Sequence, residues 1–195
     1  MKKYWRIFEI TPGGWLLLSV LYFFADLDEF LIIIMCVLVH EMGHLFMLEL
    51  FGLRIRRIEL SFTGMTIFYN DALLYGVREC FTALCGPLFG LIVGVLCSVS
   101  GNVLQSNYLL LFAGGNIVLS LFNLLPAKPL DGWRCIHALF PFAAQIISVL
   151  TALVVLVVGI AVMYGGYGIS LAIMGIILLL QDSPHNDRRK RRIRT

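Results

Sequence analysis

Long apolar stretches separated by short charged segments limit this chain to a membrane fold. Of its 195 residues 59% are hydrophobic and only 14% are charged, and most charges lie outside the apolar stretches. A helix needs about 20 apolar residues to cross the hydrocarbon core of a bilayer. The sequence therefore predicts an all-α polytopic membrane protein, a six-transmembrane-helix bundle. The six expected spans are about Ile7–Ala25, Phe30–Leu53, Cys80–Ser100, Tyr108–Leu125, Phe142–Tyr164 and Gly168–Leu180.

The placement of charges predicts how the bundle is oriented. Basic residues collect at the start of the chain, in the tail Arg188–Arg194 and in the loops after the second and fourth spans, whereas Asp26, Asp28 and Glu29 follow the first span. By the positive-inside rule the basic segments are cytoplasmic, which puts both termini there and fits an even number of crossings. We expect residues 182–195 to form a polybasic cytoplasmic tail that meets anionic lipids rather than nucleic acid.

One span carries a group of polar residues that a lipid-facing helix would not tolerate. His40-Glu41-Met42-Gly43-His44 lies within Phe30–Leu53. A carboxylate at mid-membrane costs ~2.5–3.5 kcal/mol on insertion scales, so Glu41 needs a partner or a purpose. Residues four apart share one face of a helix, so His40 and His44 can bind one metal ion beside Glu41. The alternative is that the two histidines only form polar contacts between helices.

A zinc ion would need a third protein ligand and would leave one position to water. The best candidate is Asp131, which follows the segment Asn123–Leu130 with its two prolines, Pro126 and Pro129. Proline interrupts regular helix, and irregular backbone at membrane depth is tolerated where it lines a cavity or is buried in protein. An ordinary surface turn is the alternative for this segment. Weaker ligand candidates are Glu59, Glu79, Cys135 and His137.

Between the second and third spans, Arg54–Tyr69 alternates partly between apolar and polar residues around Thr63-Gly64. This pattern predicts a short membrane-associated β-hairpin with a glycine turn. Such a hairpin could offer an edge strand to an extended substrate, which makes Thr63 and Gly64 candidate substrate-binding residues; a plug at the membrane surface is the alternative. The five cysteines suggest neither a disulfide framework nor a cysteine-based zinc site.

HEMGH on the second span, followed by NLLPAKPLDGWR after the fourth, resembles the site-2 protease family of intramembrane zinc metalloproteases. The six-span plan with its hairpin is most similar to the bacterial sporulation branch, which cleaves a membrane-tethered sigma-factor precursor. The resemblance implies a Zn²⁺ cofactor bound by His40, His44 and Asp131, with Glu41 as catalytic base. It also implies that Asn123 polarises the scissile carbonyl or holds the substrate backbone.

The same resemblance sets expectations for the organisation and setting of the protein. Residues 1–181 would form the intramembrane metalloprotease domain, with no CBS or PDZ domain, in a bacterial cell membrane. The partners would be a membrane-tethered protein substrate and a regulatory membrane protein. One departure stands out: the family commonly has two glycines after the aspartate, and the second is Trp133 here.

Two functions of other classes fit parts of the sequence. A catalytically silent relative could bind membrane proteins as a scaffold, although the intact Glu41 argues against it. A small transporter could move protons or metal ions through intramembrane His and Glu residues. Such a transporter would more naturally show a second charged site or paired repeats, and neither is evident in the sequence.

Overall fold

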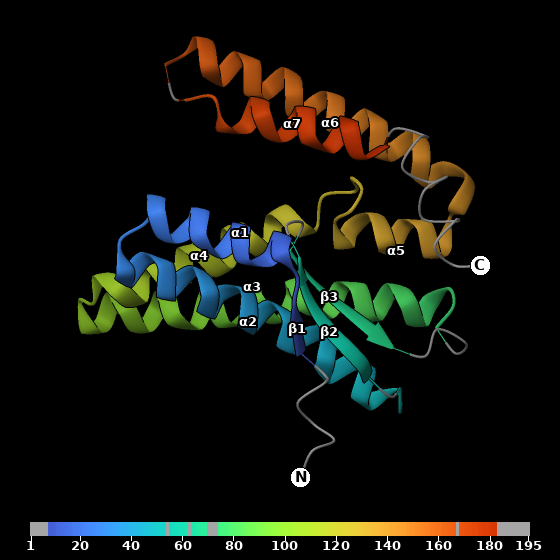
Figure 1. The fold of residues 1–195 in the computed structure, drawn as a ribbon, viewed down its shortest axis with the longest axis horizontal. Helices are drawn as coiled ribbons and strands as arrows, with labels where there is room; N and C mark the ends of the chain where they lie inside the picture. The colour runs from blue at the N-terminus through green and yellow to red at the C-terminus, as the bar shows by residue number, and fades with distance from the viewer. Residues whose placement is uncertain (1–7, 54, 62–63, 70–73, 167, 183–195) are drawn as a thin grey trace. The chain divides into compact units, whose positions relative to one another are not determined.

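The computed structural model describes residues 8–53, 55–61, 64–69, 74–166 and 168–182. The predicted polybasic tail and Thr63 lie outside these residues. The chain divides into two compact units, residues 1–75 with 85–121 and residues 76–84 with 122–195. These described residues form seven helices and three strands. Figure 1 shows their order along the chain.

Each predicted span corresponds to a helix, but the helices differ in length. Among the described residues, three are long and apolar enough to cross a membrane: α2 (Leu27–Leu50), α3 (Val77–Leu104) and α6 (Pro141–Tyr164). Shorter apolar helices are α1 (Pro12–Phe24), α4 (Asn107–Asn123) and α7 (Ser170–Asp182). The protein is therefore a mainly helical membrane protein with three candidate spans, and six crossings remain a prediction.

The predicted first helix is wrong at its start. Phe8–Ile10 forms strand β1, and α1 begins only at Pro12. Proline suits the first turn of a helix because it lacks the N–H that would be unsatisfied there. The side chain of Thr11 caps the helix by accepting a hydrogen bond from the backbone N–H of Gly14, 3.2 Å away. The break at Pro12 thus separates a strand from a helix.

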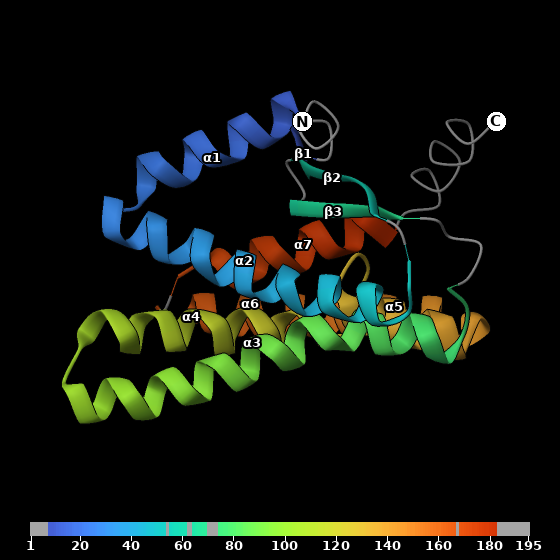
Figure 2. The ribbon, with the colours of Figure 1, turned by 90° about the horizontal axis from the view of Figure 1, so that it is seen from below.

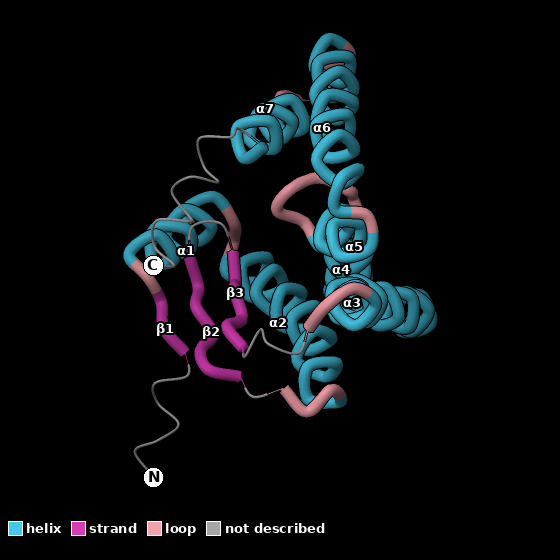
Figure 3. Tube along the Cα trace, turned by 90° about the vertical axis from the view of Figure 1, so that its right-hand side faces the viewer, coloured by secondary structure: helices cyan, strands magenta, loops and turns pink. Residues whose placement is uncertain are grey.

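The predicted hairpin is present and belongs to a three-stranded sheet in the order β1-β2-β3. β2 (Ile55–Ser61) and β3 (Gly64–Tyr69) are antiparallel, with Ser61 opposite Gly64 at the turn. Gly64 has φ +111°, a conformation that side chains disfavour. β1 adds to the other edge of β2 in parallel, which the sequence analysis did not predict. Figure 3 shows the strands side by side.

In the first unit, α2, α3 and α4 pack closely at small residues (Figure 2). A Cβ added to Gly43 of α2 would lie 2.5 Å from the carbonyl oxygen of Cys85 on α3. A Cβ added to Gly90 of α3 would overlap the hydroxyl of Ser120 on α4. Small residues let helix backbones approach closely, which is how membrane helices gain packing contact. The glycines of α3 therefore lie where a neighbouring helix contacts it.

The second unit is built on the pair α6 and α7, which lie side by side in Figure 3. Gly159 of α6 contacts Ala172 of α7, and Gly175 of α7 contacts Leu156 of α6, so the two helices run antiparallel. Ala152 and Leu178 from this pair form a buried cluster with Ala127. Since Ala127 belongs to the proline-rich segment, that segment is packed against the helix pair.

Candidate metal centre

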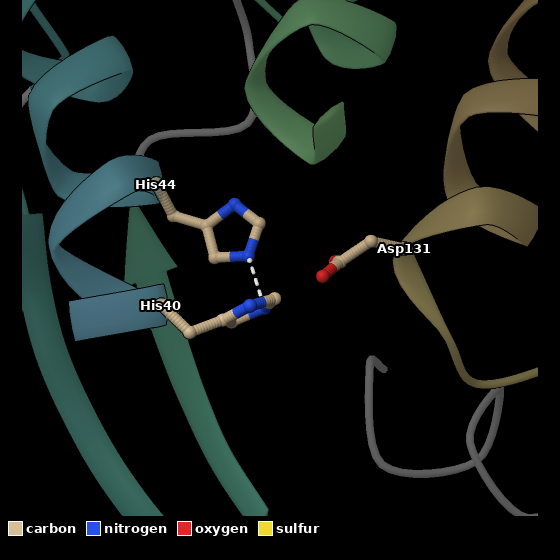
Figure 4. A group of neighbouring side chains, drawn as sticks. All are labelled: His40, His44 and Asp131. Carbon is tan, nitrogen blue, oxygen red and sulfur yellow. Dashed lines mark hydrogen bonds between the residues drawn. The ribbon is translucent and has the colours of Figure 1, made fainter. Parts of the chain in front are cut away.

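His40 and His44 are one helical turn apart on α2 and lie side by side (Figure 4). Both are buried, with 5% of their surface exposed. Their Nε2 atoms are 3.2 Å apart, and their rings are nearly perpendicular with an interplanar angle of 77°. The predicted pairing of the two imidazoles is therefore present within the first unit.

The distance between these nitrogens fits a shared metal ion. Zinc–nitrogen bonds of about 2.0–2.1 Å at a tetrahedral angle place two ligand nitrogens roughly 3.3–3.4 Å apart. The observed distance of 3.2 Å between the two Nε2 atoms is close to this value. Imidazole nitrogens are also among the ligands that zinc prefers. The His40–His44 pair thus has the spacing and chemistry of half of a zinc site.

Gly86 on α3 provides the space in which the His44 ring lies. A Cβ at this position would overlap Nε2 of His44 and would lie 2.8 Å from its Cδ2 atom. The two helices are in close contact here, because a Cβ added to Gly43 of α2 would lie 2.8 Å from the Cα atom of Gly86. Gly86 therefore positions His44. The sequence alone does not indicate this role, because it depends on a contact between two helices.

We expect Gly86→Ala to weaken zinc binding by roughly 10–100-fold, the range found when support for a ligand is lost. The added methyl group would displace the His44 ring. The measurement is zinc affinity by competition with a chromogenic chelator. Gly114→Ala is the matched control, because a Cβ at Gly114 on α4 meets nothing within 4 Å. Equal affinity in both variants would contradict the role of Gly86.

Glu41 lies next to His40 on α2 and is partly buried. Its place in the helix sets its side chain about 100° around the axis from His40, on a neighbouring face. A carboxylate beside the two imidazoles is the arrangement that the pentad predicts. Its catalytic role stays a prediction.

In the second unit, Asn123 ends α4 and Asp131 begins α5 (Asp131–Leu139), so the segment between them connects two helices. The backbone N–H of Lys128 donates a hydrogen bond to Ser148 Oγ on α6, at 2.8 Å. Together with the fully buried Ala127, this bond holds the segment against α6. The predicted interruption by proline is confirmed, and the segment is not an ordinary surface turn.

Asp131 is buried, with 7% of its surface exposed (Figure 4). It occupies the first turn of α5, where the helix dipole favours a negative charge. Its Oδ1 atom is 3.1 Å from a guanidinium nitrogen of Arg134, one turn later. These surroundings favour the ionised carboxylate, the form that binds a metal ion.

Gly132 is required by packing rather than by its backbone angles. Its φ is not positive, and a Cβ there would overlap the carbonyl oxygen of Leu124 and lie 2.7 Å from that of Leu125. A glycine after Asp131 lets the backbone of the preceding segment pack against the start of α5.

The weaker ligand candidates have other interactions. Glu59 forms an ion pair with Arg57 at 2.9 Å. Cys135 of α5 forms a disulfide with Cys80 of α3, a bond that the sequence analysis did not predict. The ring of His137 is exposed and stacks on Trp133 at a centroid distance of 4.7 Å. Glu79 lies in the first turn of α3 and is partly buried. It is therefore the remaining alternative to Asp131 as the third zinc ligand.

A comparison with family models finds no match. Among curated proteins, the chain is 30% identical to a zinc metalloprotease of Methanocaldococcus jannaschii over 115 residues, which are 56% of this chain and 33% of that protein. It is 28% identical to stage IV sporulation protein FB of Bacillus subtilis over 137 residues, which are 68% of this chain and 47% of the relative. The chain thus spans between a third and a half of the length of these two relatives.

A solved site-2 protease from Methanocaldococcus jannaschii has a similar fold, with a TM-score of 0.66 at 22% sequence identity. The similarity covers 90% of this chain and 88% of that structure. The two similar sequences and the shared fold confirm the resemblance to the site-2 protease family that the HEMGH and LDG motifs carry.

Proposed function

We propose that this protein is an intramembrane zinc endopeptidase that hydrolyses a peptide bond in or next to a transmembrane segment of a membrane-tethered protein. His40, His44 and Asp131 are the proposed zinc ligands, and Glu41 is the proposed catalytic base. The observation that carries the proposal is the buried His40–His44 pair with its 3.2 Å separation of Nε2 atoms. The name of the Methanocaldococcus jannaschii relative supports the choice of zinc.

The residues of this chain fit a hydrolytic mechanism. When bound, zinc would polarise the scissile carbonyl and lower the pKa of a coordinated water. Glu41 accepts the proton of the attacking water and passes it to the leaving amine. The side-chain amide of Asn123, at the end of α4, donates a hydrogen bond to the carbonyl oxygen as negative charge develops there.

A helical substrate must be unwound locally before its carbonyls are accessible, because a helix uses them in its own hydrogen bonds. We propose that β3 receives the unwound segment as an added strand. β3 pairs only with β2 among the described residues, so its other edge can offer main-chain hydrogen bonds. Gly64, at the start of β3, and Thr63 would contact the substrate near the turn.

The proposed substrate is a membrane-tethered sigma-factor precursor, as the resemblance to the sporulation branch implies. The similarity to stage IV sporulation protein FB of Bacillus subtilis supports this choice of branch. The proposed setting is a bacterial cell membrane with both termini cytoplasmic. A regulatory membrane protein and anionic lipids at the basic tail complete the proposed set of partners.

The test is cleavage of a tethered substrate by the purified full chain in proteoliposomes, using a sigma-factor precursor first and a panel of single-span proteins next. We expect fragments with a new terminus in or beside the transmembrane segment, found by mass spectrometry. A zinc chelator should abolish cleavage, and added zinc should restore it, because hydrolysis needs the metal.

Other outcomes would favour the rival functions. Binding of the substrate without any fragment, even with zinc present, would indicate a scaffold. Movement of zinc or protons across sealed vesicles, without cleavage of any tested substrate, would indicate a transporter.

A further inference from the structure

The second unit contains a covalent cross-link outside the proposed catalytic residues. The disulfide Cys80–Cys135 joins the first turn of α3 to the middle of α5, across 55 residues of sequence. Cys36, Cys85 and Cys97 are free. The bond therefore joins one pair out of the five cysteines, one in the first turn of α3 and the other in the short helix α5.

The cross-link is one helical turn from the proposed aspartate ligand. Cys135 follows Asp131 by four residues, so both side chains lie on one face of α5. α5 has only nine residues, and it packs against α6 in the same unit. A covalent bond to α3 at Cys135 thus limits the movement of the turn that carries Asp131.

The surroundings of the two cysteines indicate a reducing compartment. Arg78 is two residues before Cys80, and Arg134 directly precedes Cys135. By the positive-inside rule such basic residues mark the cytoplasmic side. Disulfides in mesophile cytosol are usually transient and catalytic or redox-sensing rather than permanent. A bond at this position would therefore open and close with the thiol–disulfide balance of the cell.

We propose that Cys80 and Cys135 are a reversible thiol–disulfide site that fixes α5, and with it Asp131, to α3. The consequence for zinc rests on the proposed function, because it takes Asp131 as a ligand. The oxidised site holds the ligand in place and slows the loss of zinc. The reduced site lets α5 move and releases zinc faster.

The chemistry needs a low-molecular-weight disulfide as the oxidant. The partly exposed Cys135 attacks that disulfide as a thiolate, forming a mixed disulfide and releasing one small thiol. The buried Cys80 then displaces the second small thiol and closes the protein bond. The two cysteine thiols lose two electrons and two protons, and the small disulfide gains them as two thiols.

The test compares the purified full chain after treatment with oxidised glutathione or dithiothreitol. Maleimide labelling under denaturing conditions and intact mass count the free thiols, and a chromogenic chelator measures the rate of zinc loss. We expect the oxidised protein to carry two fewer labels and to lose zinc roughly tenfold more slowly. Cys97→Ser, at a free cysteine of α3, should keep this difference, whereas Cys135→Ser and Cys80→Ala should remove it.

Equal label counts under the two treatments would overturn the proposal, and so would a bond that forms without changing the rate of zinc loss. Failure of the zinc site itself would look different, since no zinc would be found in either redox state. In that case the label count still shows whether the disulfide forms, and the thermal unfolding midpoint shows whether it stabilises the protein. A bond that raises the midpoint in wild type and in Cys97→Ser supports the clamp on α5, and an unchanged midpoint overturns it.

Discussion

Replacing Glu41 with Gln should lower the cleavage of a reconstituted membrane substrate by roughly 10²–10⁴-fold, the contribution of a positioned general base. Glutamine has nearly the same shape as glutamate but cannot accept a proton at neutral pH. The histidines that precede and follow it on α2 are unchanged, so zinc should remain bound. The measurements are the cleavage rate in proteoliposomes and the zinc content of the same preparation.

A second glutamate on the same helix gives the matched control. Glu49 lies eight residues after Glu41 on α2 and is exposed. Glu49→Gln removes the same charge from the same helix without touching the proposed site, and it should cleave at the wild-type rate. Undiminished cleavage by Glu41→Gln would contradict its role as the base. Loss of zinc from that variant would instead show that Glu41 supports the metal site.

The histidine pair of the candidate site could be predicted because its two residues are close together in the sequence. His40 and His44 are four residues apart inside an apolar stretch, and helical periodicity alone places them on one face. The structure adds the distance between their Nε2 atoms, which sequence spacing cannot supply. It also adds Gly86, whose role depends on a contact with a different helix.

The parts that the sequence analysis missed depend on pairs far apart in the chain. β1 pairs with β2 through Phe8 and Ile58, and the disulfide joins Cys80 to Cys135. The periodicity of apolar residues indicates local helix or strand, and it gives no information about such long-range partners. The boundary between β1 and α1 could have been predicted from Pro12, because proline is common at the first position of a helix.

The second expected result with a large effect concerns the third ligand. Asp131→Ala should reduce the affinity for zinc by more than the roughly 10–100-fold that loss of a ligand's support causes. The variant leaves only the two imidazoles of α2, and a structural or catalytic zinc site needs at least three protein ligands. Cleavage should be lost together with zinc. Equilibrium competition with a chelator measures the affinity, and metal analysis of the purified variant measures the content.

Two further variants separate coordination from structural support. Glu79→Ala removes the rival carboxylate on α3, and it should keep zinc if Asp131 is the ligand. Arg134→Ala removes the ion pair with Asp131 but leaves the carboxylate in place. If Asp131 only anchored α5 through that pair, Arg134→Ala would lose zinc as severely as Asp131→Ala. Zinc retained by Asp131→Ala and lost by Glu79→Ala would assign the third ligand to α3.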